Sequence, residues 1–139
     1  MKTAEGVFEF TRWEESAYSE PDASPKLTQA RIRNDFHGDI EGSSDLVYVM
    51  TYITDDRGTF VGYEQVQGTL SDRDGSFVLR HDGTFHEGTV RAALNIVAGS
   101  GTGALAGISG EGEYIATHGQ KQSPYTIHWR IDGAGATDS

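Results

Sequence analysis

The sequence predicts an all-β fold: a single eight-stranded antiparallel sheet closed into a β-barrel. Apolar and polar residues alternate with a period of two through most of the chain, and helical periodicity is scarce. Clusters of Gly, Asp and Asn separate the alternating segments at a spacing typical of sandwiches and barrels. The 18 glycines follow no collagen-like period, so they indicate turns, bulges and close backbone approaches within a sheet.

Eight alternating segments supply the predicted strands. They cover residues 4–13, 26–36, 45–54, 59–70, 76–85, 89–98, 110–116 and 125–131. Residues 14–25 are acidic and contain two of the three prolines, which predicts a surface loop that could cover a barrel mouth. We expect one barrel domain over residues 1–132 and a small, polar, disordered tail at residues 133–139.

Composition restricts the classes of function. The absence of cysteine excludes disulfides and thiolate metal sites and favours a reducing compartment. No apolar run is long enough for a signal peptide or a membrane span, so we expect a cytoplasmic protein. The formal charge of −10 disfavours nucleic acid and membrane surfaces as partners, because both are anionic. Nothing in the composition predicts a particular oligomeric state.

A hairpin between residues 59 and 85 has a predictable register. If residues 72 and 73 form its turn, Glu64 faces His81 on an otherwise apolar face. A slip of two residues would keep the faces and change the partners. The predicted inward pairs are Phe60–Phe85, Gly62–Gly83, Glu64–His81, Val66–Leu79 and Gly68–Phe77.

The next turn, Glu87-Gly88, is a typical hairpin signal and extends the same apolar face into a third strand. Its predicted inward pairs are Phe85–Val90, Gly83–Ala92, His81–Leu94, Leu79–Ile96 and Phe77–Ala98. Two independent turns therefore predict one consistent interior.

Alternation assigns the remaining strands to faces. Phe8 and Phe10 point inward, and Trp13 then requires a bulge or a place over the barrel end. In residues 45–54 the sequence allows either of two inward sets: Tyr48, Met50 and Tyr52, or Val49, Thr51 and Ile53. Further inward residues are Thr28, Ala30, Ile32, Asn34 and Phe36 in the second strand, and Tyr125, Ile127, Trp129 and Ile131 on one side of the last.

Glu64 and His81 are the candidate catalytic residues, because they are the clearest charged pair on an apolar face. A buried carboxylate beside an imidazole can hold the ring in one tautomer and raise its basicity, or act as a base itself. The alternative is a structural ion pair that satisfies two buried polar groups and helps to set the register. Both interpretations are open from the sequence.

Aromatic residues are expected to line the interior around this pair. Tyrosines offer hydroxyl groups to the same cavity, although inward tyrosines are also packing residues with a polar tip. Gly62, Gly68 and Gly83 would leave room beside them. The predicted ligand-binding residues are Tyr48, Tyr52, Phe60, Phe85, Tyr125 and Trp129.

Other kinds of site are disfavoured. Residues 101–106 match the G-x-G-x-x-A dinucleotide pattern, but Gly107, Gly110 and Gly112 would break the helix that must follow. The five histidines show no metal-binding spacing, so we expect neither a metal nor any other cofactor. The glycine-rich run 99–112 is instead expected to be a tight crossover, with Leu105 and Ile108 plugging one barrel end.

Four sequence blocks carry a resemblance to a known family. They are AEGVFEFTRWEE, FHGDIEG, GYEQVQGTLSDRDGSFVLRHDGTF and GSGTGALAGISGEG. In this order and spacing they resemble the domain-of-unknown-function family 3224, over nearly the whole chain from Ala4 to Ile131. The resemblance implies an eight-stranded antiparallel barrel similar to allene oxide cyclase, in the class that also includes lipocalin-like barrels. No catalytic residue is carried over from allene oxide cyclase, because its motifs do not align with this chain.

Three hypotheses for function follow. The first is a barrel that binds a small, largely hydrophobic molecule, with Glu64, His81 and tyrosines as its polar contacts. The second is a cofactor-free isomerase or cyclase, in which the Glu64–His81 pair moves a proton of such a molecule. The third is a structural or interaction barrel with a filled core, because eight strands enclose space for side chains or for one small ligand.

Overall fold

The computed structural model describes residues 1–22 and 25–132, which form a closed antiparallel β-barrel. Within these two ranges there is no helix, and so none long and apolar enough to cross a membrane. Eight long strands form the barrel, and a two-residue strand is added to its wall. The strands are β1 (Lys2–Ser19), β2 (Lys26–Gly38), β3 (Ile40–Thr54), β4 (Arg57–Leu70), β5 (Arg73–His86), β6 (Thr89–Ile96), β7 (Thr102–Gly103), β8 (Ile108–Thr117) and β9 (Ser123–Ile131).

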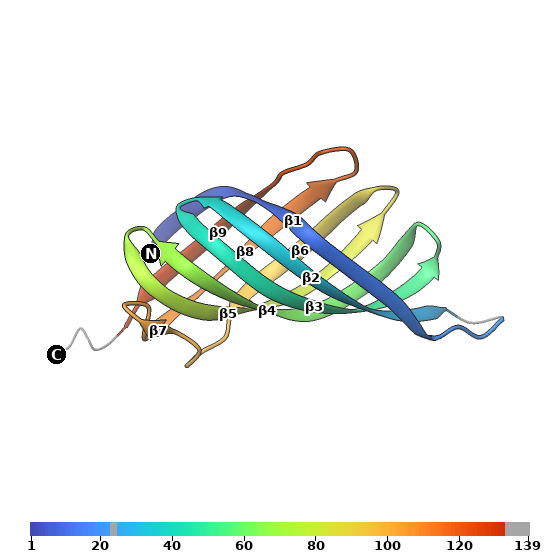
Figure 1. The fold of residues 1–139 in the computed structure, drawn as a ribbon, viewed down its shortest axis with the longest axis horizontal. Helices are drawn as coiled ribbons and strands as arrows, with labels where there is room; N and C mark the ends of the chain where they lie inside the picture. Colours follow the sequence, from blue (N-terminus) through green and yellow to red (C-terminus); the bar gives the residue numbers. More distant parts are fainter. Residues whose placement is uncertain (23–24, 133–139) are drawn as a thin grey trace.

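The eight long strands pair with their sequence neighbours around the barrel, and β1 pairs with β9 to join the two ends of the chain. Pairing between β4 and β5 closes the sheet into a barrel. The β3–β4, β5–β6 and β8–β9 connections lie together at one end of the barrel (Figure 1). The β2–β3 and β4–β5 turns lie at the other end, near the N-terminus.

All eight predicted strands are present, and most are longer than predicted. The main error concerns residues 14–25, because β1 continues to Ser19 and pairs with β2 as far as Leu27. A bulge at Thr11 shifts the register between Phe10 and Arg12, which lets the long strand bend along the barrel. Residues 23–24 of the predicted loop and the predicted tail at 133–139 lie outside the described residues.

The predicted β4–β5 register was wrong by two residues. The turn is Ser71-Asp72, with φ values of 47° and 71°, as a tight two-residue hairpin of type I′ requires. In this register Phe60 lies opposite Gly83 and Phe85 opposite Gly58. Each aromatic ring then packs over the backbone of a glycine. The predicted register would instead have placed Phe60 opposite Phe85 and Gly62 opposite Gly83.

The predicted faces of β2, β4, β5, β6 and β9 were correct, whereas Phe10 of β1, predicted to point inward, lies beside the bulge at Thr11 and is 60% exposed. Tyr48 and Met50 point inward on β3, whereas Val49 and Ile53 are 42% and 49% exposed, which decides between the two alternatives. The β5–β6 register agrees with the prediction from Phe85–Val90 to Leu79–Ile96. Its last predicted pair, Phe77–Ala98, is absent because β6 ends at Ile96.

The glycine-rich run covers the part of β5 that β6 leaves unpaired. Strand β7 pairs with Gly75 and Ser76 of β5, and Ser100 Oγ accepts a hydrogen bond from Val78 N at 3.0 Å. The following turn places Leu105 and Ile108 in the core, where both are almost fully buried. They pack that end of the interior together with Ile40, Val66, Leu70, Phe77, Leu79, Ile127 and Trp129.

Gly83→Ala tests the packing of rings over glycines. A Cβ atom at residue 83 would lie 2.4 Å from both Phe60 Cζ and the backbone oxygen of Arg91, so the ring and the neighbouring backbone of β6 must shift. We expect the free energy of unfolding to fall by about 1–3 kcal/mol, as for other overpacked cores. Urea denaturation checks this, with the outward and exposed Thr84→Ala as the control on the same strand. Equal stability of both variants would contradict the register.

Candidate functional site

The other end of the barrel is hollow. It contains a cavity of about 900 Å³ whose mouth is formed by Asp55 and Asp56 of the β3–β4 turn, Gly88, and residues 118–121 of the β8–β9 connection. Its apolar walls are formed by Phe8, Phe10, Trp13, Ile32, Leu46, Met50, Phe60, Phe85 and Val90. Four buried polar side chains line it: Asn34, Tyr48, Tyr114 and Ser123.

Glu64 and His81 form a hydrogen-bonded pair in the interior. Glu64 is opposite Leu79, and His81 is opposite Gly62, so the two are diagonal neighbours on adjacent strands. Their side chains are long enough to meet across this diagonal, with 2.7 Å between His81 Nε2 and Glu64 Oε1. The pair therefore forms despite the shifted register, since both residues stay on the inward face.

Glu64 has two more partners from neighbouring strands. Its Oε2 accepts hydrogen bonds from Asn34 Nδ2 of β2 at 2.9 Å and from Ser44 Oγ of β3 at 2.5 Å. Burial on its own would raise the pKa of Glu64, but hydrogen bonding and electrostatic attraction from His81 and the bonds from Ser44 and Asn34 outweigh it. The net pKa lies below the ordinary value, so Glu64 is a carboxylate at neutral pH.

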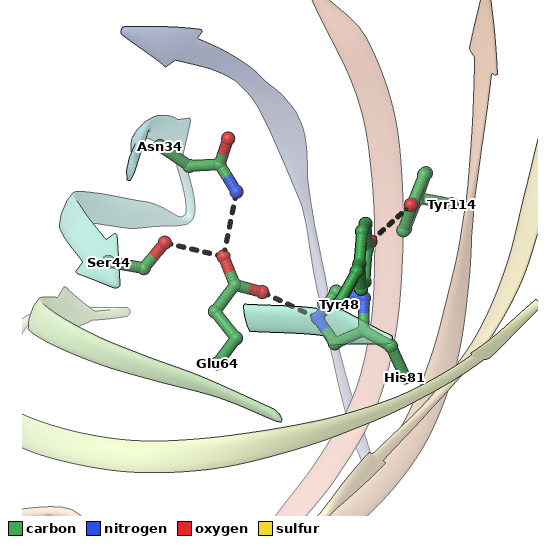
Figure 2. A network of polar contacts seen from close by, with 6 residues as sticks. All are labelled: Asn34, Ser44, Tyr48, Glu64, His81 and Tyr114. Carbon is green, nitrogen blue, oxygen red and sulfur yellow. Dashed lines mark hydrogen bonds and ion pairs between the residues drawn. The ribbon is translucent and has the colours of Figure 1, made fainter. Parts of the chain in front are cut away.

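The network continues from His81 to two tyrosines (Figure 2). Tyr48 Oη lies 2.9 Å from His81 Nδ1 and 2.5 Å from Tyr114 Oη. Tyr48 is on β3 and Tyr114 on β8, which are four strands apart in either direction around the eight-stranded barrel. The contact between their hydroxyls therefore crosses the interior. Burial raises the pKa of both tyrosines above the ordinary value, so both are protonated at neutral pH.

Asn34, Tyr48 and Tyr114 together form the polar floor of the cavity. Glu64 and His81 do not line the cavity themselves, and connect to it through this floor. At the floor, a polar contact with a molecule in the cavity would be made by Tyr48, Tyr114 or Asn34, which Glu64 and His81 orient. Ser123 and the charged side chains of the mouth also line the cavity.

The predicted ligand-binding residues divide into two groups. Tyr48, Tyr52, Phe60 and Phe85 line the cavity. Tyr125 and Trp129 do not, because they lie on β9 beyond the floor, in or beside the packed core. The Tyr125 hydroxyl accepts a hydrogen bond from Ile40 N at 3.0 Å, and burial raises its pKa to about 12.

The Tyr52 hydroxyl forms a hydrogen bond with Glu15 at the rim of the cavity. It donates to Glu15 Oε2, which also accepts a bond of 2.8 Å from Thr28 Oγ1. Glu15 Oε1 accepts from Trp13 Nε1 at 3.0 Å. The strand extension that was predicted as a loop therefore brings an acidic residue to the rim and holds Trp13 and Tyr52 in place.

Sequence reasoning did not identify Asn34, Ser44 and Tyr114 as site residues. Asn34 carried a signal, because it was predicted on the inward face among apolar residues and needed a polar partner there. Tyr114 follows a glycine-rich stretch in which alternation is weak, and Ser44 precedes the predicted strand at 45–54. Neither residue carried a signal that the sequence alone could reveal.

No group of three or more His, Asp or Glu side chains that could hold a metal ion occurs in the described part of the chain. The site consists instead of one carboxylate, one imidazole, two phenols, one hydroxyl and one amide. These groups can exchange protons and hydrogen bonds.

The blocks quoted from the sequence belong to a continuous family match. A family model described as a protein of unknown function (DUF3224) matches residues 4–129. The chain belongs to the DUF3224 family. A crystal structure of a DUF3224 protein of unknown function from Shewanella oneidensis MR-1 has a similar fold, with a TM-score of 0.71 and 25% sequence identity. The likeness covers 94% of this chain and 99% of that chain. No curated protein matches the chain.

Glu64→Gln tests the energetic role of the carboxylate in this DUF3224 barrel. We expect the free energy of unfolding at pH 7 to fall by about 1–3 kcal/mol, because buried donors lose a charged acceptor. The pKa of Glu64 is lower in the folded state, so its stabilising contribution is complete above the ordinary value of 4.5 and is lost as the pH falls through the folded value. The difference between wild type and variant should therefore narrow below pH 4.5.

Urea denaturation between pH 7 and pH 3 measures this difference. Glu113→Gln, on the exposed outer face of β8, is the matched control and should leave stability nearly unchanged. A Glu64→Gln difference that stays constant over the whole pH range would show that the carboxylate is not stabilised by its partners.

Proposed function

We propose that this protein binds a small, largely hydrophobic molecule inside the open half of its barrel. The observation that carries the proposal is the cavity of about 900 Å³, which has apolar walls and a few convergent polar groups. Small-molecule sites combine these features in volumes of roughly 300–1,000 Å³. A barrel with a filled core, the structural alternative, fits this hollow end poorly.

The charges around the mouth favour a neutral molecule. Asp55, Asp56 and Glu9 line the cavity, and Lys121 is the cation among the lining residues. Lys121 Nζ lies 3.7 Å from Glu9 Oε2, so part of its charge is neutralised. With a formal charge of −10 on the whole chain, an anion such as a fatty-acid carboxylate would be repelled.

A second candidate function is a cofactor-free isomerase or cyclase, and the chain of hydrogen bonds from the floor to Glu64 favours it. A proton from a substrate carbon would pass to Tyr48 Oη while the Tyr48 proton passes to His81 Nδ1. The imidazolium would be stabilised by the Glu64 carboxylate, and the reverse transfer would return a proton to another carbon. Tyr48 never becomes a phenolate in this route, consistent with its raised pKa.

The resemblance to allene oxide cyclase-like barrels, expected from the sequence blocks, would support this second candidate, since those barrels impose a conformation on a flexible apolar substrate. It is a likeness of architecture, and architecture does not determine function. A cytoplasmic location, proposed from the composition, fits both candidates.

Ala116→Trp tests whether the cavity is the binding site. Ala116 lines the cavity on β8, so an indole there would fill space that a ligand needs. We expect at least tenfold weaker binding of the neutral fluorescent probe N-phenyl-1-naphthylamine, because apolar contacts are lost. Fluorescence titration measures the affinity. Ala93→Trp makes the same change on the exposed outer face of β6 and should bind like wild type.

Two results would contradict binding in the cavity. One is that wild type takes up no probe at any concentration at which the probe stays dissolved. The other is that both tryptophan variants bind as well as wild type, which would place the probe on the outer surface.

Tyr48→Phe tests the isomerase candidate. Small molecules are extracted from the protein purified from its own cells, returned to wild type or variant in D₂O, and analysed by mass spectrometry. An acid–base isomerase would incorporate solvent deuterium at carbon, and we expect this to fall at least 100-fold when the relay loses Tyr48. Tyr63→Phe removes an exposed hydroxyl on β4 and is the control. Exchange that is absent in wild type would leave binding as the function.

A further inference from the structure

Glu64 determines which nitrogen of His81 carries a hydrogen. As a carboxylate, Glu64 has acceptors alone, and its Oε1 lies 2.7 Å from His81 Nε2. A hydrogen bond at this distance requires a donor, so Nε2 must be protonated. In a neutral imidazole the other nitrogen, Nδ1, is then an acceptor.

The tyrosine hydrogens follow from this tautomer. Nδ1 of His81 accepts the hydrogen of Tyr48, and because a phenol has one hydrogen, Tyr48 has none left for Tyr114. The contact between the two hydroxyls therefore has Tyr114 as donor and Tyr48 as acceptor. Every O–H and ring N–H along the chain from Tyr114 to Glu64 then has an acceptor, which is the condition buried polar groups satisfy.

The reverse direction leaves a hydrogen without a partner. An imidazolium would donate from Nδ1 to Tyr48, Tyr48 would donate to Tyr114, and the Tyr114 hydrogen would point toward the apolar cavity. No other hydrogen-bond partner of Tyr114 occurs among the described residues. The first direction, with a neutral imidazole and its donors directed at Glu64, is the one in which every O–H and N–H of the chain has an acceptor within the protein.

We infer that the two tyrosine hydroxyls of the polar floor offer lone pairs and no hydrogen to the cavity, and that the protein selects a neutral, largely apolar molecule whose buried end is a hydrogen-bond donor. Alcohols, phenols and secondary amides belong to this class. Ketones, ethers and esters lack the hydrogen that this floor would accept. The inference rests on the proposed binding function and names its ligand class.

Asn34 does not decide the polarity of the floor. Its Nδ2 gives one hydrogen to Glu64, and the rest of its amide can act as donor or acceptor. The Ser123 hydroxyl also lines the cavity and can likewise donate or accept. The selection therefore depends on Tyr48 and Tyr114, which are almost fully buried and whose positions are set from both sides of the barrel.

Three probes with the same naphthalene body test this selection: 2-naphthol, 2-methoxynaphthalene and 2-acetonaphthone. Isothermal titration calorimetry at pH 7 measures their affinities for wild type. We expect 2-naphthol to bind about tenfold more tightly than the other two, the effect of one buried hydrogen bond to an acceptor. Equal affinities, or tighter binding of 2-acetonaphthone, would overturn the inference.

Tyr48→Phe provides an independent test of the direction of the chain. Without Tyr48 Oη, the Tyr114 hydrogen has lost its acceptor and is free to bond to a ligand. The preference for 2-naphthol over 2-acetonaphthone should therefore shrink to about threefold or less, whereas the exposed Tyr63→Phe control keeps it. A preference that persists unchanged in Tyr48→Phe would show that another group selects the donor.

The outcomes distinguish a failure of the donor selection from a failure of binding in the cavity. If all three probes bind equally, the cavity binds apolar molecules and the assignment of the floor is wrong. If neither these probes nor N-phenyl-1-naphthylamine binds wild type, the binding function fails and the inference fails with it.

Discussion

The interior of this barrel is arranged around one constraint: the buried carboxylate of Glu64 needs hydrogen-bond donors. Removing Glu64 from solvent is costly, and the cost is offset by donors on three other strands: Asn34 on β2, Ser44 on β3 and His81 on β5. These strands and β4 are consecutive around the barrel, so one side chain links half of the wall. Replacing a whole buried ion pair by apolar side chains is often neutral for stability, whereas removing one partner is costly, so the more informative role of Glu64 is as an organiser of polar groups.

The same network divides the interior in two. On the side of the Tyr48–Tyr114 contact away from the cavity, large apolar side chains pack closely. There the glycine-rich segment with Leu105 and Ile108 covers the part of β5 that β6 leaves unpaired. On the other side of this contact lies the cavity, whose walls are mostly apolar. The floor keeps the polar groups in fixed positions for a molecule in the cavity, because Tyr48 is held by His81 deeper in the barrel and Tyr114 is held by Tyr48.

Much of the architecture followed from local sequence. A period of two assigns inward and outward residues whatever the partners are, which is why the faces of β2, β4, β5, β6 and β9 were predicted correctly. The β4–β5 register was missed because a slip of two residues leaves this pattern unchanged, and the turn Ser71-Asp72 lacks the glycine that usually marks a type I′ hairpin. Residues 14–19 were missed as strand because their acidic composition resembles a loop, while pairing with β2 supplies their hydrogen bonds.

By itself the sequence determined the barrel, the inward faces of five strands and the meeting of Glu64 with His81, because these depend on alternation and on turns between strands adjacent in sequence. The tertiary structure decided which residues reach the cavity. Tyr114 meets Tyr48 from the opposite side of the barrel, and this depends on closure between strands far apart in sequence. Closure likewise decided that Trp129 and Tyr125 belong to the packed end, since strand tilt and stagger set how far along the barrel each inward residue lies, and alternation carries no information on either.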